Sequence, residues 1–272
     1  MQDIQLASFP QACKKWRLFR KLSQLELALE ANVSQRHLSY LETGRSHPSR
    51  EMVIRLSEAL DIPLRERNTL LRLAGYSNIY QETRLTEPQM TPIFEAVNRV
   101  LDHHEPYPAI VIDRFWNVIQ ANTPATYLFG LTLDPSARSS SEPLNIALMT
   151  LHPNGMRRFI SNWNEILPLL VKRLRSEALA SGDPEVQEKL MSYLTLVEGE
   201  PLELTTNLNL LPVMPLELAI NGSSLSFFSV ISTFGTPQDV TTDELRIETF
   251  YPTDQTTRDF FSALPSTLAK DI

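Results

Sequence analysis

The sequence predicts two domains of different fold class: an all-α domain of five short helices, then an α+β domain with a mostly antiparallel sheet. Three observations support this prediction. Apolar residues recur at helical spacing through residues 10–75, and residues 77–90 are polar and without periodicity. From residue 91 onward, β runs alternate with helical segments. We therefore divide the chain into a helical domain (1–76), a linker (77–90) and an α+β domain (91–272).

Length and composition limit the class of protein. At 272 residues, with 42% apolar and 21% charged residues, the chain has the composition of a soluble globular protein with room for two cores. No apolar run reaches the roughly 18 residues of a membrane-spanning helix, and the N-terminus lacks a secretion signal. One cysteine, Cys13, excludes an intramolecular disulfide and a thiolate cluster. These features predict a cytoplasmic protein that does not engage a membrane.

The net charge of −7 is spread unevenly along the chain. Residues 1–75 carry 12 basic and 8 acidic side chains, a net charge of +4. The remaining residues carry 13 basic and 24 acidic side chains, a net charge of −11. Because phosphate attraction depends on the local field, the first domain can bind nucleic acid although the whole chain is acidic.

The first domain shows start and stop signals for five helices. We expect the first at 10–20, with Trp16 and Phe19 inward and basic side chains around it: Lys14, Lys15, Arg17, Arg20 and Lys21. Ser23 and Glu26 form a capping box at the start of the second, which should run to about Ala31. Two later helices should begin at Pro48 and Pro63, because proline suits the first turn, and the last should end at Gly75.

The third helix, expected at 34–43, is the candidate functional element. Ser34 is a good N-cap, and Gly44 suits a left-handed stop. Leu38 and Leu41 should face the core, while polar side chains point outward: Gln35, Arg36, His37 and Tyr40. Asn32, which tolerates positive φ, marks the preceding tight turn, so the second and third helices should form a helix-turn-helix. A helix with this outer surface suits the major groove of DNA.

We assign DNA contacts by side-chain chemistry. Arginine can bind guanine O6 and N7, and glutamine can pair with adenine, so the four outward side chains should meet base edges or nearby phosphates. Side chains at helix starts and in the following loop should meet phosphates: Gln24, Ser34, Arg45 and Ser46. Since one such helix contacts few base pairs, we predict a homodimer on an inverted repeat, with its two DNA-binding domains about one DNA turn, ~34 Å, apart. The alternative is a polar helical surface of an antitoxin or interaction domain.

The second domain mixes helical and β patterns. Helices are expected at 91–104, from Asn122 to Gly130, and at 144–151, 155–181, 184–196 and 257–264. Strands are expected at 109–113, 118–120, 201–211, 215–221, 224–234 and 245–251, with a Ser-rich loop at 134–143. Asn221-Gly222 is a strong hairpin signal between two of the strands.

The first 76 residues resemble the XRE-type bacterial regulators, and within them the MmyB-like group. The matching residues agree in order: Trp16-Arg17, Leu22-Ser23-Gln24, Leu27-Ala28, Val33-Ser34, Arg36-His37-Leu38, Glu42 to Ser46, Pro48-Ser49, Pro63 to Asn68 and Ala74-Gly75-Tyr76. The resemblance implies a lambda-repressor-like helix-turn-helix domain that binds double-stranded operator DNA and regulates transcription. One departure is Asn32, where the family usually has glycine; asparagine tolerates the same backbone.

The second domain also resembles known proteins. The order strand, Asp113, turn, strand, Asn122, helix, Gly130 is similar to the start of a PAS domain, although a helix cap alone explains Asn122. Residues from Trp163 to Asp183-Pro184 are similar to the MmyB-like group. In that group the second domain is regarded as a ligand-binding PAS variant. The likeness weakens after about residue 200, so sheet residues are not assigned from it.

We expect a ligand pocket between the sheet and the helices of residues 144–175. The candidate lining residues are large and apolar: Trp116, Phe129, Leu148, Phe159, Trp163, Leu167, Phe227 and Phe228. Any single one of them is more often an ordinary core residue, since pockets and cores use the same side chains. The resemblance implies a small apolar or amphipathic ligand, and a fatty acid is the best candidate. Its carboxylate would need cations, for which Arg114, Arg157 and Arg158 are candidates.

Other chemistry finds little support in the sequence. His103 and His104 are adjacent on a helix and point to different sides, and His152 stands alone in a loop, which disfavours a metal or haem role. The PAS-like region has no cysteine for a flavin adduct. We find no nucleophile motif, no Gly-rich phosphate loop and no metal-ligand spacing, so we predict no enzyme, no metal and no cofactor other than the apolar ligand.

The sequence therefore favours a transcription regulator in which residues 1–76 bind DNA and residues 91–272 sense a small apolar molecule. The alternative keeps the DNA-binding domain but makes the acidic domain a protein-interaction or dimerisation platform without a ligand.

Overall fold

The computed structural model describes residues 8–133, 143–202 and 212–264. Contacts divide the chain into two compact units, which are described separately. The first contains residues up to Thr83 together with Thr236–Asp243, and the second contains the rest. The predicted linker is thus divided between the units at Thr83. The sequence did not predict that residues 236–243 would join the first unit.

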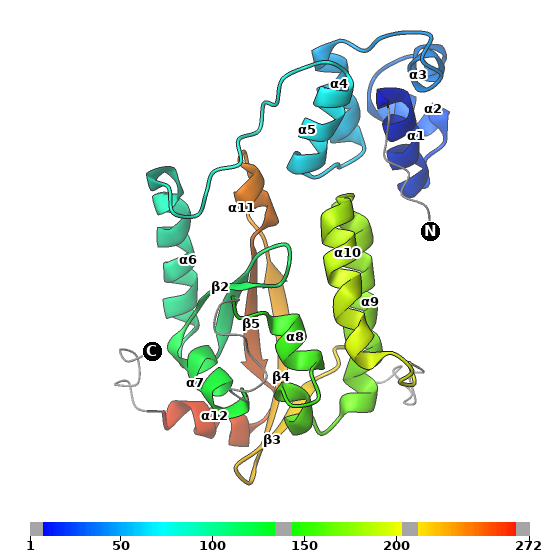
Figure 1. Cartoon of the computed structure of the whole chain (residues 1–272). Helices are drawn as coiled ribbons and strands as arrows, with labels where there is room; N and C mark the ends of the chain where they lie inside the picture. The colour runs from blue at the N-terminus through cyan, green and yellow to red at the C-terminus, as the bar shows by residue number, and fades with distance from the viewer. Residues whose placement is uncertain (1–7, 134–142, 203–211, 265–272) are drawn as a thin grey trace. The chain divides into compact units, whose positions relative to one another are not determined.

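In the first unit, residues 8–83 form five helices, as the sequence predicted (Figure 1). They are α1 (Phe9–Phe19), α2 (Gln24–Glu30), α3 (Gln35–Glu42), α4 (Arg50–Ala59) and α5 (Leu64–Leu73). One apolar cluster packs them together, with fully buried leucines at its centre: Leu27, Leu38, Leu41, Leu56 and Leu71. The predicted inward face of α3 is therefore confirmed.

The predicted caps of α2 and α3 are present. Ser23 and Glu26 form the reciprocal capping box, and the Ser34 hydroxyl accepts a hydrogen bond from the His37 amide. Asn32, at φ +52°, and Gly44, at φ +71°, take the left-handed backbone that the two turns require. Helix α4 begins two residues after the predicted Pro48, with Ser49 as its N-cap.

Two predictions for α1 are wrong. Phe19, predicted inward, is 40% exposed, although its ring still meets the edge of Trp16. Arg17, predicted on the outer surface, is only 7% exposed. The reason is a partner distant in sequence, because Glu42 from α3 lies in the core beside Arg17 and neutralises its charge.

The segment of residues 236–243 is held in the first unit by two aspartates. Asp239 accepts hydrogen bonds from the backbone amide of Thr83 at 3.0 Å and from its hydroxyl at 2.6 Å. Asp243 accepts a bond from the amide of Leu64, the first residue of α5, at 3.0 Å. That amide has no partner within the helix, because it belongs to the first turn. The N-cap residue Pro63 has no side-chain acceptor that could bind it. Asp243 therefore caps α5 from a distant part of the chain.

The second unit mixes helices and strands in the predicted order. Its α-helices are α6 (Thr91–His104), α7 (Thr123–Thr132), α8 (Ile146–Leu151), α9 (Trp163–Ser181), α10 (Pro184–Tyr193) and α12 (Gln255–Ser262). Its strands are β1 (Ala109–Ile112), β2 (Val118–Ala121), β3 (Leu216–Ile220), β4 (Ser223–Ser232) and β5 (Arg246–Pro252). Short 3-10 turns lie at Pro88–Met90, Met156–Phe159 and Leu194–Val197, and α11 (Val240–Glu244) lies mostly in the segment assigned to the first unit.

The described strands form one five-stranded sheet in the order β2-β1-β5-β4-β3, and all neighbours are antiparallel. This confirms the predicted α+β class. The hairpin between β3 and β4 turns at Asn221-Gly222, whose φ angles are +49° and +79°. Helix α6 covers one face of the sheet, where its Val97 and Leu101 pack with residues of β1 and β5 (Figure 1).

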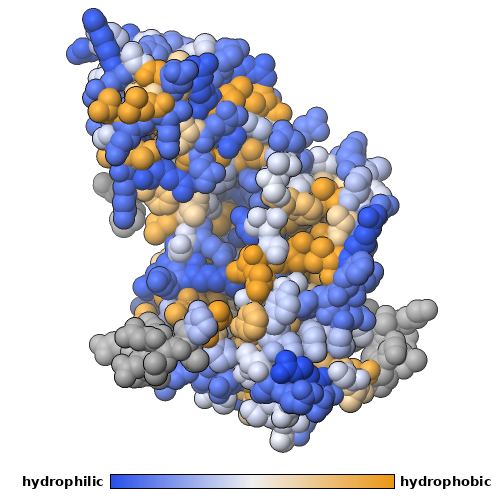
Figure 2. Space-filling model, turned by 180° about the vertical axis from the view of Figure 1, so that it is seen from behind, coloured by the Kyte–Doolittle hydropathy of each residue, from blue (hydrophilic) through white to orange (hydrophobic). Residues whose placement is uncertain are grey.

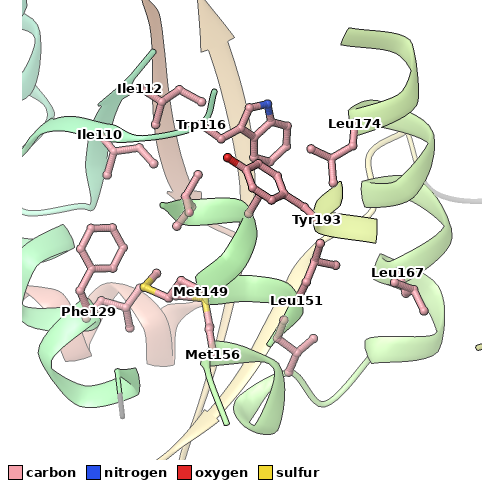
Figure 3. Packing of buried hydrophobic residues seen from close by; sticks show 14 of the residues in the cluster. Ile110, Ile112, Trp116, Phe129, Met149, Leu151, Met156, Leu167, Leu174 and Tyr193 are labelled. Carbon is pink, nitrogen blue, oxygen red and sulfur yellow. The ribbon is translucent and has the colours of Figure 1, made fainter. Parts of the chain in front are cut away.

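The larger core lies on the other face of the sheet, among α7, α8, α9 and α10. Ile110 and Ile112 point into it from β1, and Leu167 and Leu174 from α9 (Figure 3). No helix in the described residues is long and apolar enough to cross a membrane. On the face shown in Figure 2, hydrophobic residues lie among hydrophilic ones, as is usual for a folded chain.

The predicted helix of residues 155–181 is wrong over its first turns. Residues 160–162 bond instead to strand β3: the amide of Ser161 donates to the carbonyl of Glu217, and the Asn162 side chain binds the backbone of Pro215 and Glu217. These bonds delay α9 until Trp163. Most of the predicted Ser-rich loop and most of the predicted strand at 201–211 fall outside the described residues.

Candidate functional site

Helix α3 presents a polar surface away from the core of the first unit. Gln35 and Arg36 are exposed, and His37 and Tyr40 are partly exposed. The Arg36 Nε donates a 3.0 Å hydrogen bond to the Tyr40 hydroxyl, and the guanidinium carbon lies 5.4 Å from the centroid of the Tyr40 ring. This contact holds the arginine against Tyr40 on the outer side of α3 and uses only one of its five N–H donors.

The other predicted DNA contacts lie at the ends of α3 and beside it. The amides of Arg45 and Ser46 both donate to the carbonyl of Tyr40, so the loop after α3 folds back against its last turn. Ser34 opens the helix, as described above. Gln24 is half-buried, and its side-chain amide donates to Glu42 at 2.8 Å, so part of its hydrogen-bonding capacity is used within the unit.

A buried ion pair fixes the end of α3. Arg17 of α1 binds Glu42, the last residue of α3, through two hydrogen bonds of 2.7 and 2.9 Å. A third bond, of 2.8 Å, joins Arg17 to the carbonyl of Leu22. The hydrogen bond to Glu42 raises the pKa of Arg17 above its usual value, so the guanidinium stays charged. Because Gln24 of α2 binds the same carboxylate, one acidic side chain joins three helices.

The second unit contains an apolar cavity of about 230 Å³ between the sheet and the helices. It lies where the pocket was predicted, and four of the eight predicted residues line it: Trp116, Phe129, Phe227 and Phe228. Further lining residues come from β1, β3, β4 and β5, from the helices and from the 3-10 turn that begins at Met156, namely Ile110, Leu128, Ile146, Thr150, Met156, Leu216, Leu218, Ser229 and Phe250. A cavity with these walls suits an apolar ligand.

The other four predicted residues pack beside the cavity. Leu167 is fully buried in the core, and Leu148, Phe159 and Trp163 are half-buried around it. For Trp163 and Leu167 the difference arises on α9, which contributes Ile166, Leu170 and Arg173 to the cavity instead. Successive residues of a helix point about 100° apart, so these three positions form a stripe beside the one that carries Trp163 and Leu167.

Two of the three arginines predicted to bind a carboxylate, Arg114 and Arg157, have acidic partners of their own. Arg114 lies 2.6 Å from Asp183, and Arg157 lies 2.6 Å from Glu200. Arg158 is exposed and stacks over the Phe159 ring. Among the described residues that line the cavity, none of these arginines is found. The prediction that they bind a ligand carboxylate is not supported by where they lie, because none of them lines the cavity.

The sequence analysis missed an ion pair in the cavity wall. Arg173 of α9 binds Glu248 of β5 through two hydrogen bonds of 3.1 Å, and its Nε donates to Glu177 at 2.9 Å. Burial lowers the pKa of Arg173, but the two carboxylates raise it by more, and the net shift is upward. The only sequence signal was the spacing of Ile166, Leu170 and Arg173, which places an arginine in line with apolar residues.

Trp116 connects the ion pair with the cavity. Its ring lies 4.3 Å from the Arg173 guanidinium carbon, and its indole N–H donates to Glu177 at 2.8 Å. Trp116 adopts a φ of +68°, a left-handed backbone that is costly for a residue with a Cβ. The Asp113 carboxylate stabilises this turn by accepting bonds from the amides of Phe115 and Asn117. The turn after β1 therefore places the indole in the cavity wall.

The remaining candidate groups take ordinary structural roles. His103 contacts the carbonyl of Arg99 and His104 that of Phe250, and His152 accepts a bond from the amide of Asn154. Within the described residues there is no group of three His, Cys, Asp or Glu side chains that could hold a metal ion. Cys13 is buried, and desolvation raises the pKa of its thiol to about 12.

Comparisons with known proteins agree with the two units. The family model of the MmyB-like transcription regulator ligand binding domain matches residues 93–264, and a helix-turn-helix family model matches residues 14–67. No curated protein matches the chain. A solved structure, described as an RNA-binding light-oxygen-voltage receptor, is 13% identical with a TM-score of 0.25; the match covers 95% of this chain but 62% of that one. At that similarity it indicates neither fold nor function.

A helix-turn-helix unit joined to a ligand-binding domain defines a DNA-binding transcription regulator. The chain belongs to the MmyB-like transcription regulators, because the ligand-binding family model covers more than half of its length. The resemblance seen in the sequence is thereby confirmed for both domains.

The buried pair in the first unit leads to a stability prediction. Replacing Arg17 with Met should lower the free energy of unfolding of the first unit by about 3–5 kcal/mol, because the buried charge of Glu42 loses its counter-ion and keeps only the hydrogen bond from Gln24. The double variant Arg17→Met, Glu42→Leu should regain most of this loss, since no buried charge remains. Thermal or urea denaturation followed by circular dichroism measures both. Lys15→Met, at an exposed position of the same helix, is the control; equal loss in Lys15→Met and Arg17→Met would contradict the assignment.

Proposed function

We propose that this regulator binds a specific operator through helix α3 and that a small amphipathic molecule with an apolar chain, held in the cavity of the second unit, modulates that binding. The proposal depends above all on one observation: the family's ligand-binding domain here encloses an apolar cavity of about 230 Å³. A ligand changes operator affinity only if it binds the DNA-binding and non-binding arrangements with different affinity.

The outer surface of α3 supports the proposal for DNA. Its side chains carry donors and acceptors that can pair with the edges of bases: an amide at Gln35, a guanidinium at Arg36 and a ring nitrogen at His37. Arg36 is held against Tyr40 before DNA arrives, which reduces the entropy lost on binding. Arg45 and Ser46 lie in the loop that folds back on the last turn of α3, and their proximity to α3 supports the proposal that they contact phosphates.

Two substitutions distinguish base contacts from phosphate contacts. Arg36→Ala should weaken binding to the preferred operator by roughly 1–3 kcal/mol and relax selectivity at one position, because a base contact is lost. Arg45→Ala should weaken binding to all sequences alike and reduce the salt slope by about one, because one phosphate contact is lost. Fluorescence anisotropy with specific and random duplexes over a range of salt measures both. If the two variants behave identically, the proposed orientation of α3 is wrong.

We further propose that the active form on DNA is a homodimer on an inverted repeat. A single α3 contacts only a few base pairs, and two copies related by a twofold axis read two half-sites about one helical turn apart, ~34 Å.

Sedimentation tests the dimer directly. Analytical ultracentrifugation of the full chain with an operator duplex should show two protein chains for each duplex. Moving the half-sites apart by about five base pairs should abolish the cooperative complex, because the second site then faces the other side of the duplex. A complex of one chain with one duplex at saturating protein would contradict the proposal.

The cavity supports an aliphatic ligand. Its walls are mostly Leu, Ile, Met and Phe side chains. A cavity of about 150 Å³ in a comparable core accommodates benzene, so by proportion 230 Å³ suits roughly nine carbon atoms. A fatty acid of medium chain length is the simplest candidate of this size.

Native mass spectrometry of the purified full chain should detect a retained molecule of acyl-chain mass in the second unit. Replacing Leu218, which lines the cavity and is fully buried, with Trp should exclude that molecule by filling the space. Leu179→Trp, at a residue of α9 that is 60% exposed, is the matched control and should retain the ligand. If the wild-type chain neither retains nor takes up any aliphatic molecule, the second domain acts as an interaction or dimerisation platform instead.

A further inference from the structure

The charges in the cavity wall constrain the head group of the ligand. Among the described lining residues, Arg173 and Glu248 carry the formal charges, one positive and one negative. They are bound to each other through two hydrogen bonds, and Glu248 is only 6% exposed. The part of the wall formed by described residues is therefore polar at one place but carries no net charge.

Both members of the pair retain hydrogen-bonding capacity. Arginine has five N–H donors, and the bonds of Arg173 to Glu248 and Glu177 use three of them. Each oxygen of Glu248 accepts one bond, although a carboxylate has about four acceptor sites. A ligand group can thus donate to Glu248 and accept from Arg173 at the same time without separating them.

An ionised head group would disturb this balance. Its charge would enter an apolar cavity whose own charges already cancel, so it would lose hydration without gaining a counter-ion. An anion would be disfavoured further, because Glu177 lies behind Arg173 and makes the cluster of three side chains net negative. A cation would also lose its hydration, and it would lie beside the guanidinium of Arg173, which lines the cavity whereas Glu177 does not.

We infer that Arg173 and Glu248 form a head-group subsite for an uncharged group that both donates and accepts a hydrogen bond, such as a hydroxyl or a primary amide. This inference rests on the proposed ligand function of the cavity. It replaces the ionised fatty acid as the preferred ligand by an uncharged molecule with the same aliphatic chain. Trp116, stacked on Arg173, closes one side of the subsite.

A series of ligands that differ only in the head group tests the inference. Isothermal titration of the full chain, freed of bound lipid, at neutral pH would use octan-1-ol, octanamide, octanoate and octylamine. The alcohol and the amide should bind about tenfold or more tightly than either ion, because only the ions bring a net charge into the wall.

The variant Glu248→Gln tests the role of the pair. It keeps the shape of the side chain but removes the negative charge that lines the cavity, so that Arg173 and Glu177 balance each other and only Arg173 lines the cavity. Octanoate should therefore bind about tenfold more tightly than to the wild type, while octan-1-ol changes little. Glu188→Gln, at an exposed position of α10, is the matched control and should leave all four affinities unchanged. The wild-type series decides the question even if Glu248→Gln does not fold.

The outcomes separate this inference from the proposed function. Binding of none of the four compounds to the wild type would overturn the ligand function of the cavity and the subsite with it. Binding of octanoate or octylamine as tightly as octan-1-ol would overturn the subsite alone and leave an aliphatic cavity with no preference for a neutral head group. No change of octanoate affinity in a folded Glu248→Gln variant would equally exclude Glu248 as the source of the discrimination.

Discussion

The placement of helix α3 depends on one buried ion pair, that of Arg17 with Glu42. Leu38 and Leu41 bury the inner side of α3, but apolar contacts alone permit small rotations of a helix of eight residues. The two hydrogen bonds between Arg17 and Glu42 are directional, and each requires its own N–H group. They therefore fix the rotation of α3, and with it the direction in which the side chain of Arg36 points.

The second unit uses the same kind of interaction beside its cavity. There Leu167 and Leu174 of α9 pack in the core on the sheet, but beside the cavity part of the space between α9 and the sheet is open. Arg173 and Glu248 span it with two hydrogen bonds, and Trp116 and Glu177 hold the guanidinium from other sides. Such a pair adds little net stability over apolar residues, but it specifies a geometry. In this unit the pair sets the position of Arg173 and Glu248 in the cavity wall and makes that wall polar at one place.

The local parts of the fold could be predicted from sequence, because caps and turns depend on neighbouring residues. The Ser23–Glu26 capping box, the left-handed Asn32 and the Asn221-Gly222 hairpin are examples. The parts that could not be predicted depend on partners distant in sequence. Arg17 is buried only because Glu42, twenty-five positions later, meets it, and Arg173 enters the cavity wall only because Glu248 lies opposite. Periodicity placed α9 among the apolar elements but could not choose between two adjacent stripes of the same helix.

The order of elements along the chain provides a physical route between the two functions. Strands β4 and β5 both line the cavity, β4 through Phe227 and β5 through Glu248 and Phe250. The chain that connects them passes through residues 236–243, which belong to the first unit, where Asp243 caps the start of α5. Strands of the cavity wall are thus joined by a segment that is itself bonded to the DNA-binding unit. Because Asp239 and Asp243 bond to Thr83 and Leu64, this connection reaches that unit outside α3 and leaves the recognition surface free of it.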